Sequence, residues 1–272
     1  MRTDFCNNES LHLSLESTEC LPPMTVKDDL AIIDAEGIHY KRLNAVLKGL
    51  KGNGVRKVEV HNVCGQRYIG TGVDDGLEIE IYGTPGNDLG AFLDGPRINV
   101  YGNVQDACGN TMNNGLIVVH GHTGDVAGYS LRGGKIFTRD DVGYRAGINM
   151  KEYRDTRPFM VIGGSAGDFL GEYMAGGVIL VLGLNLREGE HHRARFVGTG
   201  MHGGVIYVRG KMSHLGEEVE VADVNEKDVR LIQDLVSEFR QHFGLSSSED
   251  MTKDFTKIVP VSHRPYGRLY AF

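Results

Sequence analysis

The chain lacks the features that mark secreted, membrane and metal-cradling proteins. No basic, apolar and small-residue succession opens the sequence, and no apolar run is long enough to cross a bilayer. The absence of any Cys-x-x-Cys pair excludes the usual spacing of an iron–sulfur or zinc cradle. The four cysteines are widely and irregularly spaced, at Cys6, Cys20, Cys64 and Cys108. We therefore expect reduced thiols in a cytoplasmic protein that has no membrane partner.

Positive charge is also scarce. The 36 acidic residues outnumber the 29 basic ones, the formal net charge is −7, and the basic residues are scattered. This balance argues against a nucleic-acid partner. Tryptophan is absent and proline occurs only 7 times, whereas the 38 glycines lack the one-in-three period of collagen. With 40% hydrophobic residues among 272, the chain can bury the core of one large domain or two small ones.

Glycine instead follows a long repeat. Seven copies of a short apolar segment each end at one reference position, and three successive intervals, from Gly83 to Asp140, are nineteen residues long. The reference positions are Gly83, Gly102, Gly121, Asp140, Gly164, Gly183 and Gly210. Two apolar residues in alternation precede each one, as Ile79 and Ile81 do in the first copy. Alternation predicts a strand with one buried face, and a fixed period of about twenty residues predicts a stacked repeat.

Glycines also mark corners between these strands. Twelve residues before the reference position lie Gly90, Gly109, Gly128, Gly171 and Gly198. Seven residues before it lie Gly76, Gly95, Asn114, Gly133, Gly176 and Gly203. Because asparagine also adopts positive φ readily, we expect a left-handed backbone at this second corner. Three short sides per repeat predict a parallel β-helix of about seven coils, since seven-residue connections leave no room for the helices of an α/β fold.

Helical patterns flank the repeats. Leu43, Val46, Leu47 and Leu50 predict a helix over 39–50, and Asn225 followed by Asp228 predicts a capped helix that ends at Gly244. We therefore divide the chain into an N-terminal extension with a flanking helix (1–57), the glycine-rich β-helix (58–215), and a C-terminal helix and tail (216–272). Residues 58–65 are expected to form an imperfect zeroth coil. Charged insertions at 151–158 and 187–193 are expected to loop out of the stack, where insertions often form contact surfaces.

One motif resembles a cofactor site. Gly198-Thr-Gly-Met-His-Gly203 matches the dinucleotide fingerprint GxGxxG. That fingerprint requires a helix after the loop, whose N-terminus meets the pyrophosphate. Here the strand pattern Val205 to Val208 follows at once. We interpret the motif as a coil corner.

Titratable candidates are few. They are His120 and His122 beside Gly121, His191 and His192 in the larger insertion, Cys64 and Cys108. Neither histidine pair has a third ligand at suitable spacing, so surface or partner contact is the favoured interpretation over metal binding. Cys108 adjoins a corner glycine, which favours a small buried thiol over a nucleophile.

Acidic residues suggest one other class of protein. Secreted β-helix polysaccharide lyases and hydrolases cluster acidic residues along one face, for calcium binding or acid–base work. Asp125, Asp140 and Asp141 are the only such suggestion here, and no secretion signal accompanies them. The run Arg139-Asp140-Asp141 interrupts the glycine ladder and is a candidate for ion pairs with a partner or with the nearby insertion.

Several segments together resemble a known family. They are Leu89-Gly-Ala-Phe-Leu93, Gly134, Gly163-Gly-Ser-Ala-Gly167, Gly171-Glu-Tyr-Met-Ala-Gly-Gly177, Val178-Ile-Leu-Val-Leu-Gly183 and Gly200-Met-His-Gly-Gly204. Between Val58 and Gly210 the chain resembles the C-terminal domain of the glutamate synthase large subunit, the glycine-rich GXGXG β-helix domain. The helix followed by Phe255-Thr-Lys-Ile-Val-Pro260 resembles the end of that domain. The N-terminal extension departs from the family pattern.

This resemblance implies a single-stranded right-handed parallel β-helix, a hand that agrees with the general preference of crossovers. It assigns the chain no catalytic, cofactor-binding or metal-binding residue. It implies a stand-alone structural subunit that braces a glutaminase-type amidotransferase subunit and a second subunit with FMN and iron–sulfur clusters. Such a complex makes glutamate from glutamine and 2-oxoglutarate. A β-helix subunit of formylmethanofuran dehydrogenase or of N-methylglutamate synthase, a scaffold for an unrelated partner, and self-association stay open as alternatives.

Overall fold

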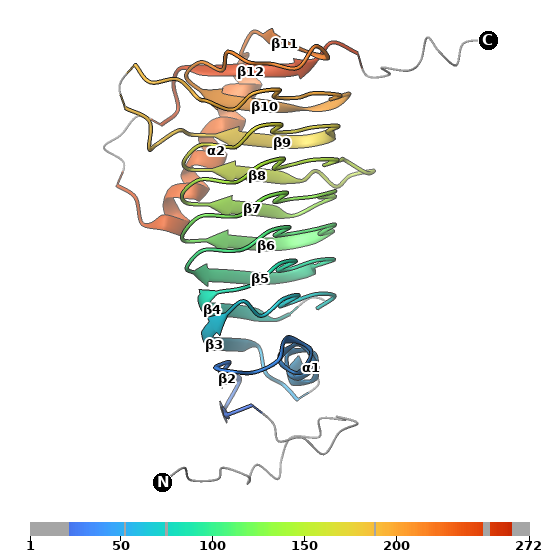
Figure 1. The fold of residues 1–272 in the computed structure, drawn as a ribbon, viewed down its shortest axis with the longest axis vertical. Helices are drawn as coiled ribbons and strands as arrows, with labels where there is room; N and C mark the ends of the chain where they lie inside the picture. Colours follow the sequence, from blue (N-terminus) through green and yellow to red (C-terminus); the bar gives the residue numbers. More distant parts are fainter. Residues whose placement is uncertain (1–21, 52, 74–75, 188, 247–250, 263–272) are drawn as a thin grey trace, which may run out of the picture.

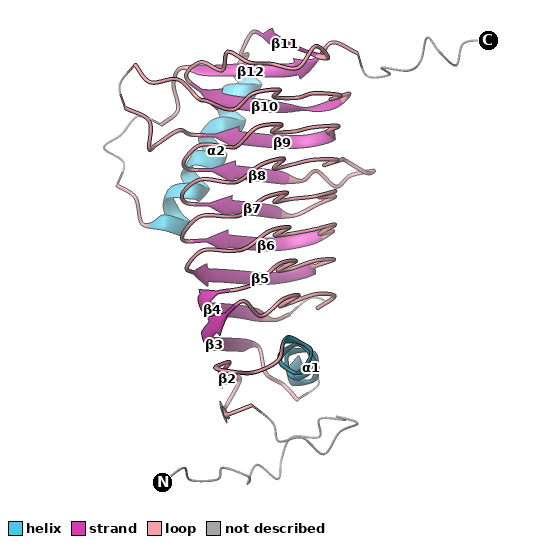
Figure 2. Cartoon of the chain, in the orientation of Figure 1, coloured by secondary structure: helices cyan, strands magenta, loops and turns pink. Residues whose placement is uncertain are grey.

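The computed structural model of the chain describes residues 22–51, 53–73, 76–187, 189–246 and 251–262. These residues are mainly β structure, with two helices, α1 (Tyr40–Lys51) and α2 (Glu226–Phe243). The strands are β1 (Met24–Lys27), β2 (Leu30–Asp34), β3 (Lys57–Cys64), β4 (Glu78–Thr84), β5 (Asp94–Tyr101), β6 (Asn114–Val119), β7 (Lys135–Thr138), β8 (Phe159–Ile162), β9 (Ala175–Val181), β10 (Gly203–Arg209), β11 (Val219–Ala222) and β12 (Phe255–Pro260). Figure 2 shows them stacked in one column with α2 alongside.

The strands form one sheet in the order β1-β2-β3-β4-β5-β6-β7-β8-β9-β10-β12-β11. From β2 to β10 every neighbouring pair is parallel, which confirms the parallel β-helix (Figure 1). The seven repeats found in the sequence are β4 to β10. Because seven strands enclose six turns, the stack has about six turns between them, one fewer than predicted. β3 joins the stack as the expected zeroth coil, and β2 adds a parallel strand that the sequence pattern did not predict.

The inward ladder lies in register through the whole stack. Ile98 pairs with Ile117, and Ile117 pairs with Ile136. All three side chains are fully buried in the main core. Burial of each such side chain contributes about 1.5–3 kcal/mol before conformational entropy is subtracted. A second, narrower ladder of single bridges joins successive coils at Val104, Thr123, Val142 and Ala166.

The corner twelve residues before the reference position has the predicted left-handed backbone. Gly128 has φ +67°, and a Cβ there would lie 2.3 Å from Cε of Met160 in a later coil. Glycine is therefore required twice over, by the backbone angle and by the inward contact. The residues two positions to either side of the corner also have positive φ but point outward, so that side chains as large as Phe92 occur there.

The prediction for the corner seven residues before the reference position is wrong in the later coils. Asn114 is not among the residues with positive φ, and the left-handed residue is the next one, Gly115. A register shift explains the offset, because Asp94 to Arg97 of β5 lies opposite Asn114 to Leu116 of β6. Gly133 is needed instead for close approach, since a Cβ there would lie 2.1 Å from the carbonyl oxygen of Asn113.

Different elements close the two ends of the stack. α1, which confirms the helix predicted over 39–50, buries Leu43, Leu47 and Leu50 in the main core at the N-terminal end (Figure 1). At the same end, β1 pairs antiparallel with β2, the first parallel strand of the stack. At the other end β12 runs antiparallel to β10, and β11 pairs antiparallel with β12. Antiparallel caps of this kind cover the edges that a solenoid would otherwise leave open.

α2 flanks the coils as predicted and lies along the outer face of the sheet (Figure 1). Its apolar side, with Ile232, Val236 and Phe239, forms a second core with outward residues of the later strands, including Phe137 and Leu180. Polar contacts fix both helix ends.

At the N-terminus of α2 the predicted capping box is present. Asn225 Oδ1 accepts the backbone N–H of Asp228, and Oδ2 of Asp228 accepts the N–H of Asn225. Asp228 also accepts hydrogen bonds from the Tyr207 hydroxyl and from Nζ of Lys257 at 2.7 Å. Burial alone raises the pKa of Asp228, but these hydrogen bonds outweigh it and the pKa is lowered. Gly244, with φ +63°, ends the helix as predicted.

Candidate functional site

The GxGxxG segment forms a coil corner. Gly198 and Gly200 have φ +73° and +69°, and β10 begins at Gly203 directly after them. A Cβ on Gly198 would lie 2.6 Å from Cγ1 of Val219, inside the main core. A dinucleotide loop needs a helix N-terminus at this point, and a strand occupies it. The segment serves packing between coils.

His120 belongs to an aromatic ladder on the outer face of the sheet. The rings of His61, Tyr82, Tyr101 and His120 stack with successive centroid distances of 4.5, 4.9 and 4.7 Å, one ring per coil. Phe243 at the end of α2 closes the ladder with an edge contact of 5.1 Å to His120. Burial, followed by the charges of Arg139 and His242, lowers the pKa of His120. A stacked, partly buried imidazole supports packing of α2.

The acidic candidates hold one coil to the next. Asp125 accepts the backbone N–H of Tyr144, nineteen residues later, at 2.8 Å. Asp106 accepts the backbone N–H of Asp125, and Asp168 accepts that of Arg195. These carboxylates serve as acceptors for main-chain N–H groups at the turns, in place of main-chain partners. The arrangement explains their periodic placement without calcium binding or acid–base chemistry.

The residues of the run Arg139-Asp140-Asp141 have two different functions. Arg139 donates two hydrogen bonds of 3.0 Å to its neighbour Asp140. These hydrogen bonds are the main reason that the pKa of the Asp140 carboxyl is lowered. Asp141 accepts the N–H of Ser165 at 2.6 Å and Nδ2 of Asn185 at 2.8 Å. Asn185 leads into the second insertion. Asp141 therefore links three successive coils and the base of that insertion.

Replacing Asp141 with alanine is expected to lower the free energy of unfolding by about 1–3 kcal/mol, because it leaves the Ser165 N–H and the Asn185 amide without their acceptor. Asp140→Ala removes a half-exposed ion pair and is expected to cost less than about 1 kcal/mol. Thermal unfolding of the two variants measures the difference. Equal destabilisation would contradict the assignment of Asp141 to coil-to-coil bonding.

The histidines of the second insertion differ in environment. His191 is exposed, whereas His192 is buried beside Gly183 and its Nε2 lies 3.0 Å from the carbonyl oxygen of Arg209. Burial lowers the pKa of His192. The four candidate histidines do not converge, and no group of three metal-ligating side chains occurs within the described ranges. His192 anchors the return of the insertion to β10.

Stability is expected to fall as the pH drops below about 6.5, the pKa of an unperturbed histidine. The pKa values of His120, His192 and His242 are all lowered by burial, so the unfolded chain binds protons that the folded chain does not. Lowered carboxyl pKa values, such as that of Asp228, act only at pH values below about 4. Denaturant unfolding between about pH 7.5 and 5 isolates the histidine contribution. His192→Asn should reduce the slope of stability against pH, and an unchanged slope in this variant would contradict the assignment.

The two described cysteines have opposite surroundings. Cys108 is fully buried beside its corner glycine, as predicted, and burial raises the pKa of its thiol to about 12. Such a thiol is not a nucleophile at neutral pH. Cys64 is exposed and lines a pocket of about 400 Å³ with His39 and Asn62. Cys6 and Cys20 lie outside the described residues.

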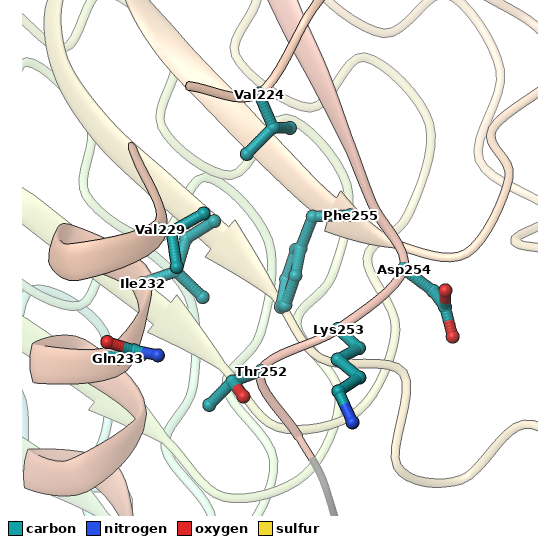
Figure 3. Close-up of a pocket in the computed structure, with 8 residues that line it drawn as sticks. All are labelled: Val224, Val229, Ile232, Gln233, Thr252, Lys253, Asp254 and Phe255. Atoms are coloured by element: carbon teal, nitrogen blue, oxygen red, sulfur yellow. The ribbon is translucent and has the colours of Figure 1, made fainter. Parts of the chain in front are cut away.

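A pocket of about 460 Å³ lies between α2 and the segment that leads into β12 (Figure 3). Val229 and Ile232 face Phe255 across it, and Lys253 and Asp254 stand at its rim. Ile232 belongs to the second core, and Phe255 packs against it. None of the candidate residues named from the sequence lines this pocket.

Sequence reasoning missed an aromatic patch at one edge of the last coils. Tyr144, Phe169 and Phe196 contact one another, with centroid distances of 5.4 and 4.9 Å. The Arg145 guanidinium lies over the first two rings, and its Nε lies 2.6 Å from Oε2 of Glu172. A signal was present, because Arg145, Phe169 and Phe196 all precede a corner glycine by two residues. Exposed aromatic rings and arginine are enriched where proteins contact one another.

In their described residues, both insertions leave the stack as predicted (Figure 1). Residues 151–158 precede β8, carry a short bridge between Tyr153 and Thr156, and leave Tyr153 61% exposed. Residues 187–193 follow β9. The two insertions therefore lie beside opposite ends of parallel strands. Neither helix of the described chain is long and apolar enough to span a membrane.

Comparison with known proteins agrees with this geometry. The sequence model of the GXGXG motif family matches residues 53–263, which include the stack from β3 onward, its C-terminal cap and α2. The uncharacterized protein MJ1350 of Methanocaldococcus jannaschii is 45% identical over 249 residues, which cover 88% of this chain and 95% of that protein. The chain therefore belongs to the GXGXG motif family, which includes the C-terminal domain of the large subunit in glutamate synthase.

Proposed function

We propose that the chain is a non-catalytic structural subunit of a glutamate synthase-type complex. It braces a glutaminase-type amidotransferase subunit against a subunit that carries FMN and iron–sulfur clusters. Glutamine hydrolysis, transfer of ammonia to 2-oxoglutarate and reduction at FMN take place on those partners. The chain itself contributes a rigid surface of fixed length.

The observation that carries this proposal is that the titratable side chains are engaged in contacts that stabilise the fold. Asp125 and Asp141 accept backbone N–H groups of later coils, His192 contacts a backbone carbonyl, and Cys108 is sealed in the core. An acid–base or nucleophilic site requires side chains that converge on a substrate. Here they diverge, one per coil, along the stack.

Rigidity supports the bracing role. Nine parallel strands share one continuous core, and both ends are covered by antiparallel strands. Each repeat of a solenoid contacts its neighbours over its whole cross-section, which favours an extended surface of fixed shape. The insertions beside opposite ends of the strands offer separate contact sites for two partners. The match covers 95% of the Methanocaldococcus protein, so nearly all of that relative is also similar to this chain.

Affinity purification of a tagged chain from its native cell tests the proposal. We expect an amidotransferase and an FMN-bearing iron–sulfur protein to co-purify in stoichiometric amounts, with glutamine-dependent glutamate formation in the eluate. Recovery with a molybdenum or tungsten enzyme would contradict it and would support a formylmethanofuran dehydrogenase subunit. Recovery with an N-methylglutamate-forming enzyme would contradict the assigned product.

A further inference from the structure

α1 concentrates positive charge at the N-terminal end of the stack. It carries four basic residues and no acidic one, in a chain whose formal net charge is −7. Leu43 and Leu47 point into the main core and are fully buried. Lys41 and Lys48, seven residues apart and therefore on one side of the helix, are exposed.

A pocket of about 330 Å³ lies between this side of α1 and the first coil corner. Its lining consists of Tyr40, Lys41, Asn44, Ala45, Lys48, Tyr68 and Thr71. The Tyr40 and Tyr68 rings lie 5.6 Å apart, and Tyr68 is 39% exposed. The hydroxyl of Thr71 is buried and has no hydrogen-bond partner within the described part of the chain. No carboxylate occurs among the described lining residues, so the pocket combines aromatic walls with an ammonium rim. We refer to Tyr40, Lys41, Lys48 and Tyr68 as the α1 surface.

We propose that the α1 surface is the docking site of the chain's own residues 1–21. This segment contains four carboxylates, Asp4, Glu9, Glu16 and Glu19, against the single basic residue Arg2. Its charge is therefore opposite to that of the α1 surface. Phe5 and the alternating Leu11, Leu13 and Leu15 supply apolar side chains that suit an aromatic pocket.

The position of the segment fits this site. Only residues 22 and 23 separate this segment from β1, which pairs with β2 at the same end of the stack that α1 closes. Twenty-one residues extend up to about 70 Å, more than enough to return to α1. Docking covers a basic and aromatic surface at a solenoid end, where uncovered ends promote association. It also gives a role to the extension that distinguishes this chain from the glutamate synthase domain pattern.

Brief acetylation of the full chain with acetic anhydride, followed by peptide mass spectrometry, tests the proposal through the reactivity of Lys41 and Lys48. Lys151, exposed in the first insertion and distant in sequence from both sets of substituted carboxylates, serves as the internal standard. A variant with Asp4→Asn, Glu9→Gln, Glu16→Gln and Glu19→Gln should acetylate Lys41 and Lys48 at least about threefold faster than the wild type. About 1 M NaCl, where the Debye length is about 3 Å, should accelerate the wild type in the same way.

A matched variant removes four carboxylates from the other end of the stack: Glu217→Gln, Glu220→Gln, Asp223→Asn and Glu226→Gln. It should leave the relative reactivity of Lys41 and Lys48 unchanged. Equal reactivity in the wild type and the N-terminal variant would overturn the proposal. So would protection that grows with protein concentration, because it would assign the α1 surface to a second copy of the chain.

Discussion

Replacing Gly102 with alanine should destabilise the stack by about 3 kcal/mol, which for a chain of this size lowers the Tm by roughly 6–12 °C. A Cβ at Gly102 would lie 2.2 Å from the carbonyl oxygen of Gly83 in the preceding coil. Both groups are main chain, so no side-chain rotation relieves the contact and neighbouring coils must separate. Thermal unfolding followed by circular dichroism measures the shift.

Gly54→Ala is the matched control for this substitution. Gly54 has φ +80°, and a Cβ placed there would meet no atom within 4 Å, so alanine at this position meets backbone strain alone. That strain costs about 1 kcal/mol. If Gly102→Ala lowered the Tm no more than Gly54→Ala, the coils would not be packed backbone to backbone as described.

Phe239→Ala should release α2 from the outer face of the sheet. Phe239 is fully buried, contacts Phe243 at a centroid distance of 4.6 Å, and would lie 2.5 Å from a Cβ placed on Gly163. Truncation of a buried phenylalanine costs about 3–5 kcal/mol. Because α2 packs on the second core, hydrogen exchange should accelerate in α2 while the inward ladder of β4 to β10 keeps its protection.

Phe92→Ala provides the comparison, since that ring is 54% exposed at a corner. We expect its effect on stability to stay within about 0.5 kcal/mol. Uniform acceleration of exchange in α2 and in the ladder after Phe239→Ala would contradict the division into two cores.

The central architecture could be predicted from the sequence because each coil repeats the same physical requirement. The register of Ile98, Ile117 and Ile136 follows from a nineteen-residue period, and the capped helix from Asn225 and Asp228. The helix-capping signal is local, and the nineteen-residue spacing is strictly periodic.

The parts that escaped prediction depend on contacts outside the repeat. β11 and β12 are short antiparallel caps whose partners are remote in sequence, so no periodicity announces them. The left-handed residue moved from Asn114 to Gly115 because β5 holds one more residue than β6 between paired positions. A bulge of that kind is decided by pairing between strands rather than by residue preference.

The candidate site was predictable in part. Asp125 and Tyr144 are nineteen residues apart, so the repeat alone places that carboxylate under the next turn. The α1 surface was not predictable from the repeat, because it joins a helix to the corner at Tyr68, and Tyr40 and Tyr68 are twenty-eight positions apart in the sequence. Its charge was visible in the sequence, but its aromatic wall required the fold.

Absorption spectroscopy and turnover of the purified full chain test the absence of catalysis most directly. We expect no flavin absorbance in the visible range, no release of ammonia from glutamine, and no glutamate formation from 2-oxoglutarate. Flavin that stays bound to the chain through purification, or turnover of glutamine by the chain without other subunits, would contradict it.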